Sequence, residues 1–200
     1  MEYRILGDSE VNVSVYAFGA WQLGDTDYWG EKENADAEEV VQTAIDAGVN
    51  LFDTAEGYGN GRSEEVLGKA LGARRKDVYI ASKVSPDNCV PVENLRASCE
   101  ASLKRLGTDT IDVYQIHWPC EPTRFDDVAA EMLRLKEEGK IRVTGVSNFG
   151  SKHLDAWMNA GECDSNQLGY NLLFRAVEYE IVPACRKHNA GILAYMPVMQ

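Results

Sequence analysis

The sequence lacks long apolar runs, paired cysteines and an excess of basic residues. No stretch approaches the about eighteen apolar residues of a membrane-spanning helix, and residues 1–4 open no apolar leader. Lysine and arginine number 20 against 32 aspartates and glutamates, so the net charge of -12 argues against nucleic acid or an anionic membrane as a partner. The five cysteines form no Cys-x-x-Cys motif, which is typical of reduced thiols, and we expect a cytoplasmic protein.

Several motifs that carry chemistry are also missing. There is no Gly-x-Gly-x-x-Gly fingerprint, no phosphate-binding Walker loop and no nucleophile elbow. The three histidines, His117, His153 and His188, do not have the spacing of metal ligands, and we expect no metal site. The sequence therefore does not predict a Rossmann domain, a nucleotide hydrolase or a serine hydrolase.

Short apolar strands alternate with helical patterns from residue 15 onward. A small hairpin is expected within residues 1–14. Strands are expected at 15–19, 49–53, 78–83, 111–117, 141–147, 165–168 and 191–195. Helices are expected at 37–45, 63–71, 91–106, 125–138, from 151 onward, and 178–188. Val40 is expected on the apolar face of the first of these helices, and Ser151 is expected to cap the helix that begins there. Strict alternation predicts parallel strands joined by right-handed crossovers.

Two architectures fit this alternation, an open doubly wound sheet and a (β/α)8 TIM barrel. The strands recur at an average of roughly 29 residues, within the size of a βαβ unit, and a complete barrel usually takes about 250 residues. If the fold is a barrel, we expect its last βα units to be missing from these 200 residues. No linker or low-complexity segment interrupts the chain, so residues 1–200 are expected to form a single domain.

Most of the expected strands end on a polar or aromatic residue. These residues are Asp53, Lys83, His117, Ser147 with Asn148, Gln167 and Tyr195. Any one of them alone fits a structural role such as a capping aspartate or a surface lysine. In a parallel barrel, however, the carboxyl ends of the strands share one face, where active sites are built. We therefore predict one site at that face.

Three of these residues, together with a nearby tyrosine, suggest proton transfer. A tyrosine, Tyr58, lies between two glycines just after the strand that ends at Asp53. Its phenol ordinarily titrates near ~10, and a nearby ammonium such as that of Lys83 would lower the pKa of Tyr58. Asp53 could hold Lys83, and His117 could orient a carbonyl oxygen. With no obvious nucleophile, the pattern favours transfer from a bound cofactor over covalent catalysis.

Three tryptophans, Trp21, Trp29 and Trp118, lie in or near loops on the same face, and we predict that they line a substrate pocket.

With these residues in place, the chain resembles the aldo-keto reductases, closest to their bacterial, plant and general-stress branch. The matching segments are Gly19-Ala20-Trp21, Asp53 through Gly59, Ala81-Ser82-Lys83, His117-Trp118-Pro119, Gly145 through Phe149, and Tyr170 through Arg175. The resemblance implies a (β/α)8 barrel, C-terminally incomplete here, that binds NADPH, with NADH less expected. It also implies reduction of aldehydes or small ketones, small carbonyl compounds being the partners.

The resemblance further assigns roles to residues. Asp53, Tyr58, Lys83 and His117 match the catalytic tetrad, with Tyr58 as the proton donor. The residues implied to hold the nicotinamide carboxamide are Ser147, Asn148 and Gln167, and Tyr195 matches the aromatic residue that stacks on the nicotinamide ring. The adenosine-phosphate site is expected beyond residue 200.

Two other functions remain open. The chain could be a non-catalytic, nicotinamide-binding regulatory subunit or an inactive fragment of the same fold. It could also be a barrel lyase that uses Lys83 as a Schiff base, although pairing of Lys83 with Asp53 disfavours this chemistry.

Overall fold

A computed structural model describes residues 1–29, 34–120 and 125–199. The chain opens with an antiparallel hairpin of β1 (Tyr3–Ile5) and β2 (Asn12–Ser14). A seven-stranded sheet follows, in which every neighbouring pair is parallel and spatial order equals chain order. Its strands are β3 (Phe18–Gly19), β4 (Leu51–Asp53), β5 (Tyr79–Val84), β6 (Ile111–Ile116), β7 (Ile141–Ser147), β8 (Ser165–Gly169) and β9 (Gly191–Tyr195).

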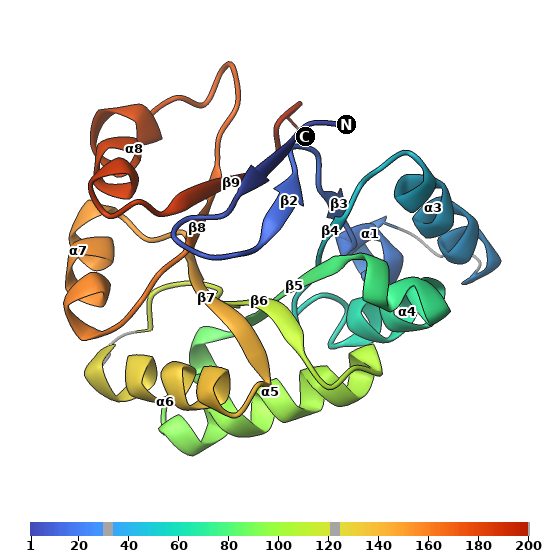
Figure 1. Cartoon of the computed structure of the whole chain (residues 1–200), viewed down its shortest axis with the longest axis horizontal. Coiled ribbons are helices and arrows are strands. Elements are labelled where there is room, and N and C mark those ends of the chain that lie inside the picture. The colour runs from blue at the N-terminus through green and yellow to red at the C-terminus, as the bar shows by residue number, and fades with distance from the viewer. Residues whose placement is uncertain (30–33, 121–124, 200) are drawn as a thin grey trace.

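Six longer helices connect successive strands and lie outside the curled sheet (Figure 1). They are α3 (Asn34–Asp46), α4 (Arg62–Leu71), α5 (Val92–Leu106), α6 (Phe125–Glu137), α7 (Ser151–Ala160) and α8 (Val177–Lys187). Shorter elements are α1 (Trp21–Gly24), α2 (Thr26–Trp29) and the 3-10 helices η1 (Gly72–Asp77) and η2 (Pro86–Asn88). The arrangement is that of a TIM barrel wall with strands following one another around a curve.

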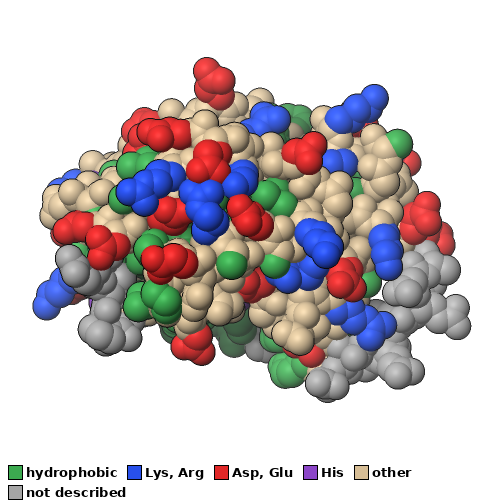
Figure 2. Space-filling view, turned by 90° about the horizontal axis from the view of Figure 1, so that it is seen from below, with side chains coloured by type: hydrophobic (Ala, Val, Ile, Leu, Met, Phe, Trp, Pro, Cys, Tyr) green, Lys and Arg blue, Asp and Glu red, His purple; other side chains and the backbone are tan. Residues whose placement is uncertain are grey.

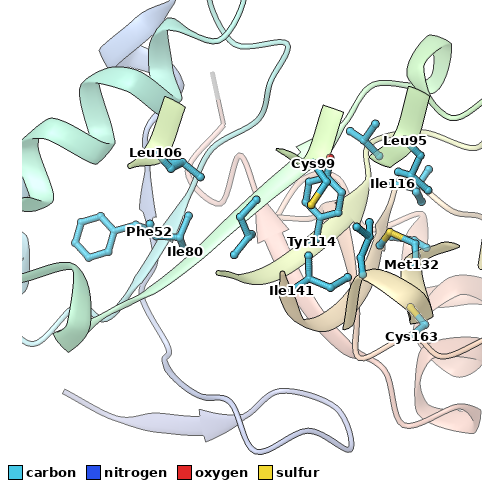
Figure 3. Packing of buried hydrophobic residues seen from close by; sticks show 14 of the residues in the cluster. Phe52, Ile80, Leu95, Cys99, Leu106, Tyr114, Ile116, Met132, Ile141 and Cys163 are labelled. Atoms are coloured by element: carbon cyan, nitrogen blue, oxygen red, sulfur yellow. The ribbon is translucent and has the colours of Figure 1, made fainter. Parts of the chain in front are cut away.

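Side chains along each strand alternate between two apolar layers. The outer layer lies between sheet and helices and contains Phe52, Ile80 and Tyr114 (Figure 3). Residues of opposite parity point to the inside of the curve, where a smaller cluster includes Leu51, Ala81, Val113 and Val143. This period of two explains why strand-end residues of the right parity reach the interior.

The amino-terminal hairpin covers one end of the curved sheet. Leu6, Val11 and Val13 belong to the inner apolar cluster. The Ser14 amide donates to Asn50 Oδ1 at 2.6 Å, next to the start of β4, so the hairpin lies at the amino ends of the strands. With this end filled by the hairpin, the opposite, carboxyl end is the one at which a site can form.

Three local predictions differ from the structure. Of the strand expected at 15–19, only Phe18–Gly19 has strand structure. The short helices α1 and α2 follow it, and their sequences show no periodic apolar pattern that would have predicted them. Val40, expected on the buried face of its helix, is 49% exposed. Ser151 was expected to cap α7, but Gly150 is the N-cap residue and Ser151 begins the helix.

The two ends of the sheet are unlike. β3 is a two-residue strand, while β9 spans five residues that are all at least partly exposed. Among the described residues no strand pairs with the outer edge of β9, and no helix is long and apolar enough to cross a membrane. Figure 2 shows acidic and basic side chains intermingled over one outer face of the molecule.

Candidate active site

The predicted site residues converge because they share inward parity at the carboxyl ends of their strands. Asp53 ends β4, and Lys83 lies next to last on β5. His117 directly follows β6. Ser147 ends β7, and Gln167 lies on β8 two positions beyond the buried Ser165. Each of the strands β4 to β8 thus places a polar residue at its carboxyl end, on the same rim of the sheet.

The Lys83 ammonium is at the centre of the site. Its side chain is fully buried, and Nζ donates to Asp53 Oδ2 at 2.8 Å and to the Thr54 carbonyl at 2.7 Å. Its remaining donor points toward Tyr58 Oη at 3.4 Å. Burial lowers the pKa of Lys83, but Asp53 and then Tyr58 outweigh it, so the pKa of Lys83 lies above its usual value. Lys83 is therefore charged at neutral pH.

Tyr58 is placed by a tight loop between β4 and α4. Gly59 has a φ of +57°, and a Cβ there would overlap the Gly24 carbonyl, so both conformation and space require glycine. The Tyr58 ring stacks on Trp21 with centroids 5.7 Å apart. Burial raises the pKa of Tyr58, and Lys83 lowers it without cancelling the burial. The expectation of a net lowered pKa therefore differs from the structure, because desolvation of the phenolate is the larger effect.

The His117 ring packs edge-on against the Tyr58 ring, with centroids 5.7 Å apart. Its amide donates to the Val84 carbonyl at 3.0 Å, which aligns the His117 loop with the end of β5. Burial, followed by the charge of Lys83, lowers the pKa of His117 to about 4. The imidazole is therefore neutral at pH 7 and can donate one hydrogen bond to an oxygen in the site.

A second group of polar residues continues around the rim. Asn148, with a φ of +62°, donates from Nδ2 to the His117 carbonyl at 3.1 Å and to Ser147 Oγ at 3.0 Å. The Tyr195 hydroxyl donates to Asn148 Oδ1 at 2.8 Å. The Gln167 amide donates from Nε2 to Asp53 Oδ1 at 2.8 Å, so this group connects directly to the Lys83 pair.

These residues fit one end of a nicotinamide dinucleotide. Ser147, Asn148 and Gln167 bring hydroxyl and amide groups together at adjacent strand ends, and these are the kinds of donor and acceptor that a carboxamide would require. Tyr195 supplies a flat ring beside them, and a Cβ added to Gly169 would lie 3.2 Å from that ring. The described residues therefore suit the nicotinamide end.

The three predicted pocket tryptophans differ in position. Trp21 stacks on Tyr58 and donates from Nε1 to Asp25 Oδ2 at 2.7 Å. Trp29 packs edge-on against Trp21 with centroids 5.4 Å apart. Trp118 is 51% exposed.

Sequence reasoning missed three contributors to the site. The Thr54 carbonyl accepts a hydrogen bond from Lys83, and the Gln167 side chain donates one to Asp53, so both help to hold the Asp53–Lys83 ion pair. The Asp25 carboxylate accepts a hydrogen bond from the Trp21 indole and fixes its orientation. Asp25 is the C-cap residue of α1 and lies four residues after Trp21, a spacing that could have indicated the contact. The backbone carbonyl leaves no sequence signal. Among the described residues no group of three or more His, Cys, Asp or Glu side chains could hold a metal ion.

Comparison with known proteins identifies this architecture. The sequence model of the Aldo/keto reductase family matches residues 16–200. The chain is 36% identical over 204 residues to aldo-keto reductase YhdN of Bacillus subtilis, covering 98% of this chain and 61% of that protein. It is 33% identical over 218 residues to the NADH-specific methylglyoxal reductase of Escherichia coli, covering 98% of this chain and 67% of that protein.

Solved structures agree. A crystal structure of an aldo/keto reductase from Klebsiella pneumoniae in complex with NADP and acetate superposes with a TM-score of 0.88 at 31% identity, covering 99% of this chain and 69% of that one. The chain thus spans about two thirds of the length of these relatives, and its curled seven-stranded sheet is part of their barrel. The chain belongs to the aldo/keto reductase family.

Proposed function

We propose that this chain carries the catalytic centre of a nicotinamide-dependent carbonyl reductase, with NADPH as reductant and aldehydes or small ketones as substrates. Residues 1–200 would act as one domain. The observation that carries the proposal is the Lys83 ammonium, which donates to Asp53 at 2.8 Å and points at the Tyr58 hydroxyl 3.4 Å away. The aldo/keto reductase match and the relative crystallised with NADP support the choice of cofactor.

In this proposal the Tyr58 hydroxyl donates its proton to the carbonyl oxygen of the substrate. The Lys83 ammonium stabilises the tyrosinate that develops, and Asp53 with the Thr54 carbonyl keeps that ammonium charged and aimed. Neutral His117 donates a hydrogen bond to the same carbonyl oxygen and orients it. The bound nicotinamide would supply the hydride. Trp21 and Trp29 would exclude water from one side.

The test is oxidation of NADPH, followed by its absorbance, with methylglyoxal and a series of simple aldehydes and ketones, and with NADH in parallel. Tyr58→Phe keeps the ring that stacks on Trp21 and removes only the proton donor. We expect kcat to fall by ~10²–10⁴ in this variant, with a much smaller change in cofactor affinity. Full turnover by Tyr58→Phe would contradict the assignment.

A non-catalytic, nicotinamide-binding subunit is the second candidate, because one relative, 32% identical over 214 residues, is a probable voltage-gated potassium channel subunit beta of Arabidopsis thaliana. Cofactor binding without turnover on any carbonyl compound would favour it. A Schiff-base lyase is disfavoured by the geometry, since all three Lys83 donors face oxygen acceptors and the pKa of Lys83 is raised. Such a lysine is protonated rather than nucleophilic.

A further inference from the structure

We propose that Gln167 is a positioning residue for the Asp53–Lys83 pair and that it links this pair to the cofactor side of the site. The inference rests on the proposed function and assigns Gln167 a role beyond contact with a carboxamide. Its basis is the bond from Gln167 Nε2 to Asp53 Oδ1, 2.8 Å long, between residues 114 positions apart in the chain.

The two oxygens of Asp53 have different donors. Lys83 Nζ donates to Oδ2 and Gln167 Nε2 donates to Oδ1, so the carboxylate is held from both sides. A carboxylate with one donor can rotate about its terminal torsion, which is broad, whereas two donors on different strands fix its plane. Asp53 in turn holds the Lys83 ammonium, so the distance from Lys83 Nζ to Tyr58 Oη depends on the position of Asp53.

Gln167 is itself well held. Gln167 is 6% exposed. Its backbone carbonyl accepts hydrogen bonds from the backbone amide of Asn148 at 2.9 Å and from Ser147 Oγ at 3.2 Å. Because Nε2 faces Asp53, the amide orientation is determined, and the acceptor oxygen Oε1 is directed away from the carboxylate. Gln167 would therefore offer Oε1 to the cofactor while Nε2 stays on Asp53, so binding on one side fixes geometry on the other.

The informative change is Gln167→Glu. Two carboxyl groups at hydrogen-bond distance cannot both ionise, so Glu at this position is expected to keep its proton and donate it to Asp53. Its pKa in the folded chain would lie above the unfolded value near ~4.3. A carboxyl group whose pKa is raised by folding contributes stability at low pH and loses it as pH rises through the folded pKa.

The experiment measures the free energy of unfolding from acid to neutral pH for wild type, Gln167→Glu, the double variant Gln167→Glu/Asp53→Asn and the control Asn148→Asp. Asn148 is a matched amide in the same group, and its hydrogen bonds go to His117, Ser147 and Tyr195 rather than to Asp53. We expect the folding equilibrium constant of Gln167→Glu to fall at least about tenfold relative to wild type between pH ~4 and ~7, and this fall to disappear in the double variant.

An unchanged pH dependence in Gln167→Glu, or one that persists after Asp53→Asn, would overturn the inference. If the double variant does not fold, Gln167→Glu is compared with the control Asn148→Asp instead. A loss of stability of similar size in the control would mean that burial of the new carboxyl group, rather than its contact with Asp53, causes the pH dependence. None of these measurements needs turnover, so they hold even if the chain reduces no carbonyl compound.

Kinetics supply the second readout when the chain is active. Gln167→Met removes the amide, and we expect a fall in kcat of about tenfold or more together with a shifted pH profile of kcat. The same variant with a raised KM for cofactor but an unshifted kcat profile would mean that Gln167 only binds the cofactor. Gln167→Glu should be most active at acid pH and lose activity as its shared proton leaves.

Discussion

A double-mutant cycle on Asp53 and Lys83 tests the arrangement on which the site depends. Lys83→Met removes a fully buried ammonium and leaves Asp53, 17% exposed, and the Thr54 carbonyl without their donor. Removing one partner of a buried ion pair typically costs 3–5 kcal/mol, and the partial exposure of Asp53 places our expectation near ~3 kcal/mol. In the double variant Asp53→Asn/Lys83→Met neither charge of this ion pair remains. We therefore expect the double variant to be more stable than the sum of the two single costs predicts.

The same change has a kinetic consequence that can be estimated. Unit charges 3.4 Å apart, the distance from Lys83 Nζ to Tyr58 Oη, attract by about 5 kcal/mol at an effective dielectric constant of ~20. Asp53 opposes this field, because its charge raises the pKa of Tyr58 while Lys83 lowers it. The full attraction would correspond to a factor of roughly 4 × 10³ in rate. We therefore expect Lys83→Met to lower kcat by less than this, by ~10²–10³.

Urea unfolding of the four proteins gives the coupling energy, which we expect to be about 2 kcal/mol. Single costs that add to the double cost within about 0.5 kcal/mol would refute the pairing. The pH dependence provides an internal check. Because the pKa of Lys83 is raised by folding, its contribution is complete below the usual lysine pKa of 10.5 and is lost as pH rises through the folded value. Wild type should therefore lose stability relative to Lys83→Met only in that alkaline range.

Three further outcomes follow from other parts of the molecule. The pKa of His117 is about 4 in the folded protein and 6.5 in the unfolded chain, so the free energy of unfolding of wild type should fall by up to about 3 kcal/mol relative to His117→Gln as pH falls from 6.5 toward 4. Unfolding at each pH measures this difference, and parallel plots of stability against pH for the two proteins would contradict a neutral imidazole in the site. Burial raises the pKa of the Cys99 thiol to about 12, so it should react with an alkylating reagent at pH 8 only after unfolding, and labelling of the native protein at Cys99, located by mass spectrometry, would show otherwise. Gly68→Ala should destabilise by ~1–3 kcal/mol despite the helix preference of alanine, since its Cβ would overlap the Leu106 carbonyl; Gly150→Ala, with nothing within 4 Å, is the control and should differ little from wild type in thermal unfolding.

The sequence predicted the strands and the convergence of the site because both depend on short-range patterns. The six longer helices and the seven-stranded parallel sheet of the described residues follow from alternating periods, and the strand-end positions of Asp53, Lys83 and Gln167 follow from their parity. A comparison with relatives then confirmed the barrel. The roles of the individual residues stay predictions.

What could not be predicted depends on packing or on atoms without a sequence signal. Val40 fits the apolar period of α3, yet it is 49% exposed, because the period does not fix how wide a stripe the sheet covers. The Thr54 carbonyl that holds Lys83 belongs to the backbone. The net effect on Tyr58 required a balance between burial and a charge 3.4 Å away, and neither quantity is encoded in spacing.

The buried ammonium explains why so many polar groups meet at this rim. A lysine with no exposed surface is stable only when acceptors surround it, and Lys83 has Asp53, the Thr54 carbonyl and Tyr58. Asp53 in turn needs a second donor for its free oxygen, which Gln167 supplies from β8. Each of these groups must face inward, so a slip of β8 by one residue would turn Gln167 outward and leave the Asp53 carboxylate without that donor. If Gln167 positions Asp53 as we propose, the pairing register of β8 and the proton affinity of Tyr58 are coupled through this chain of hydrogen bonds.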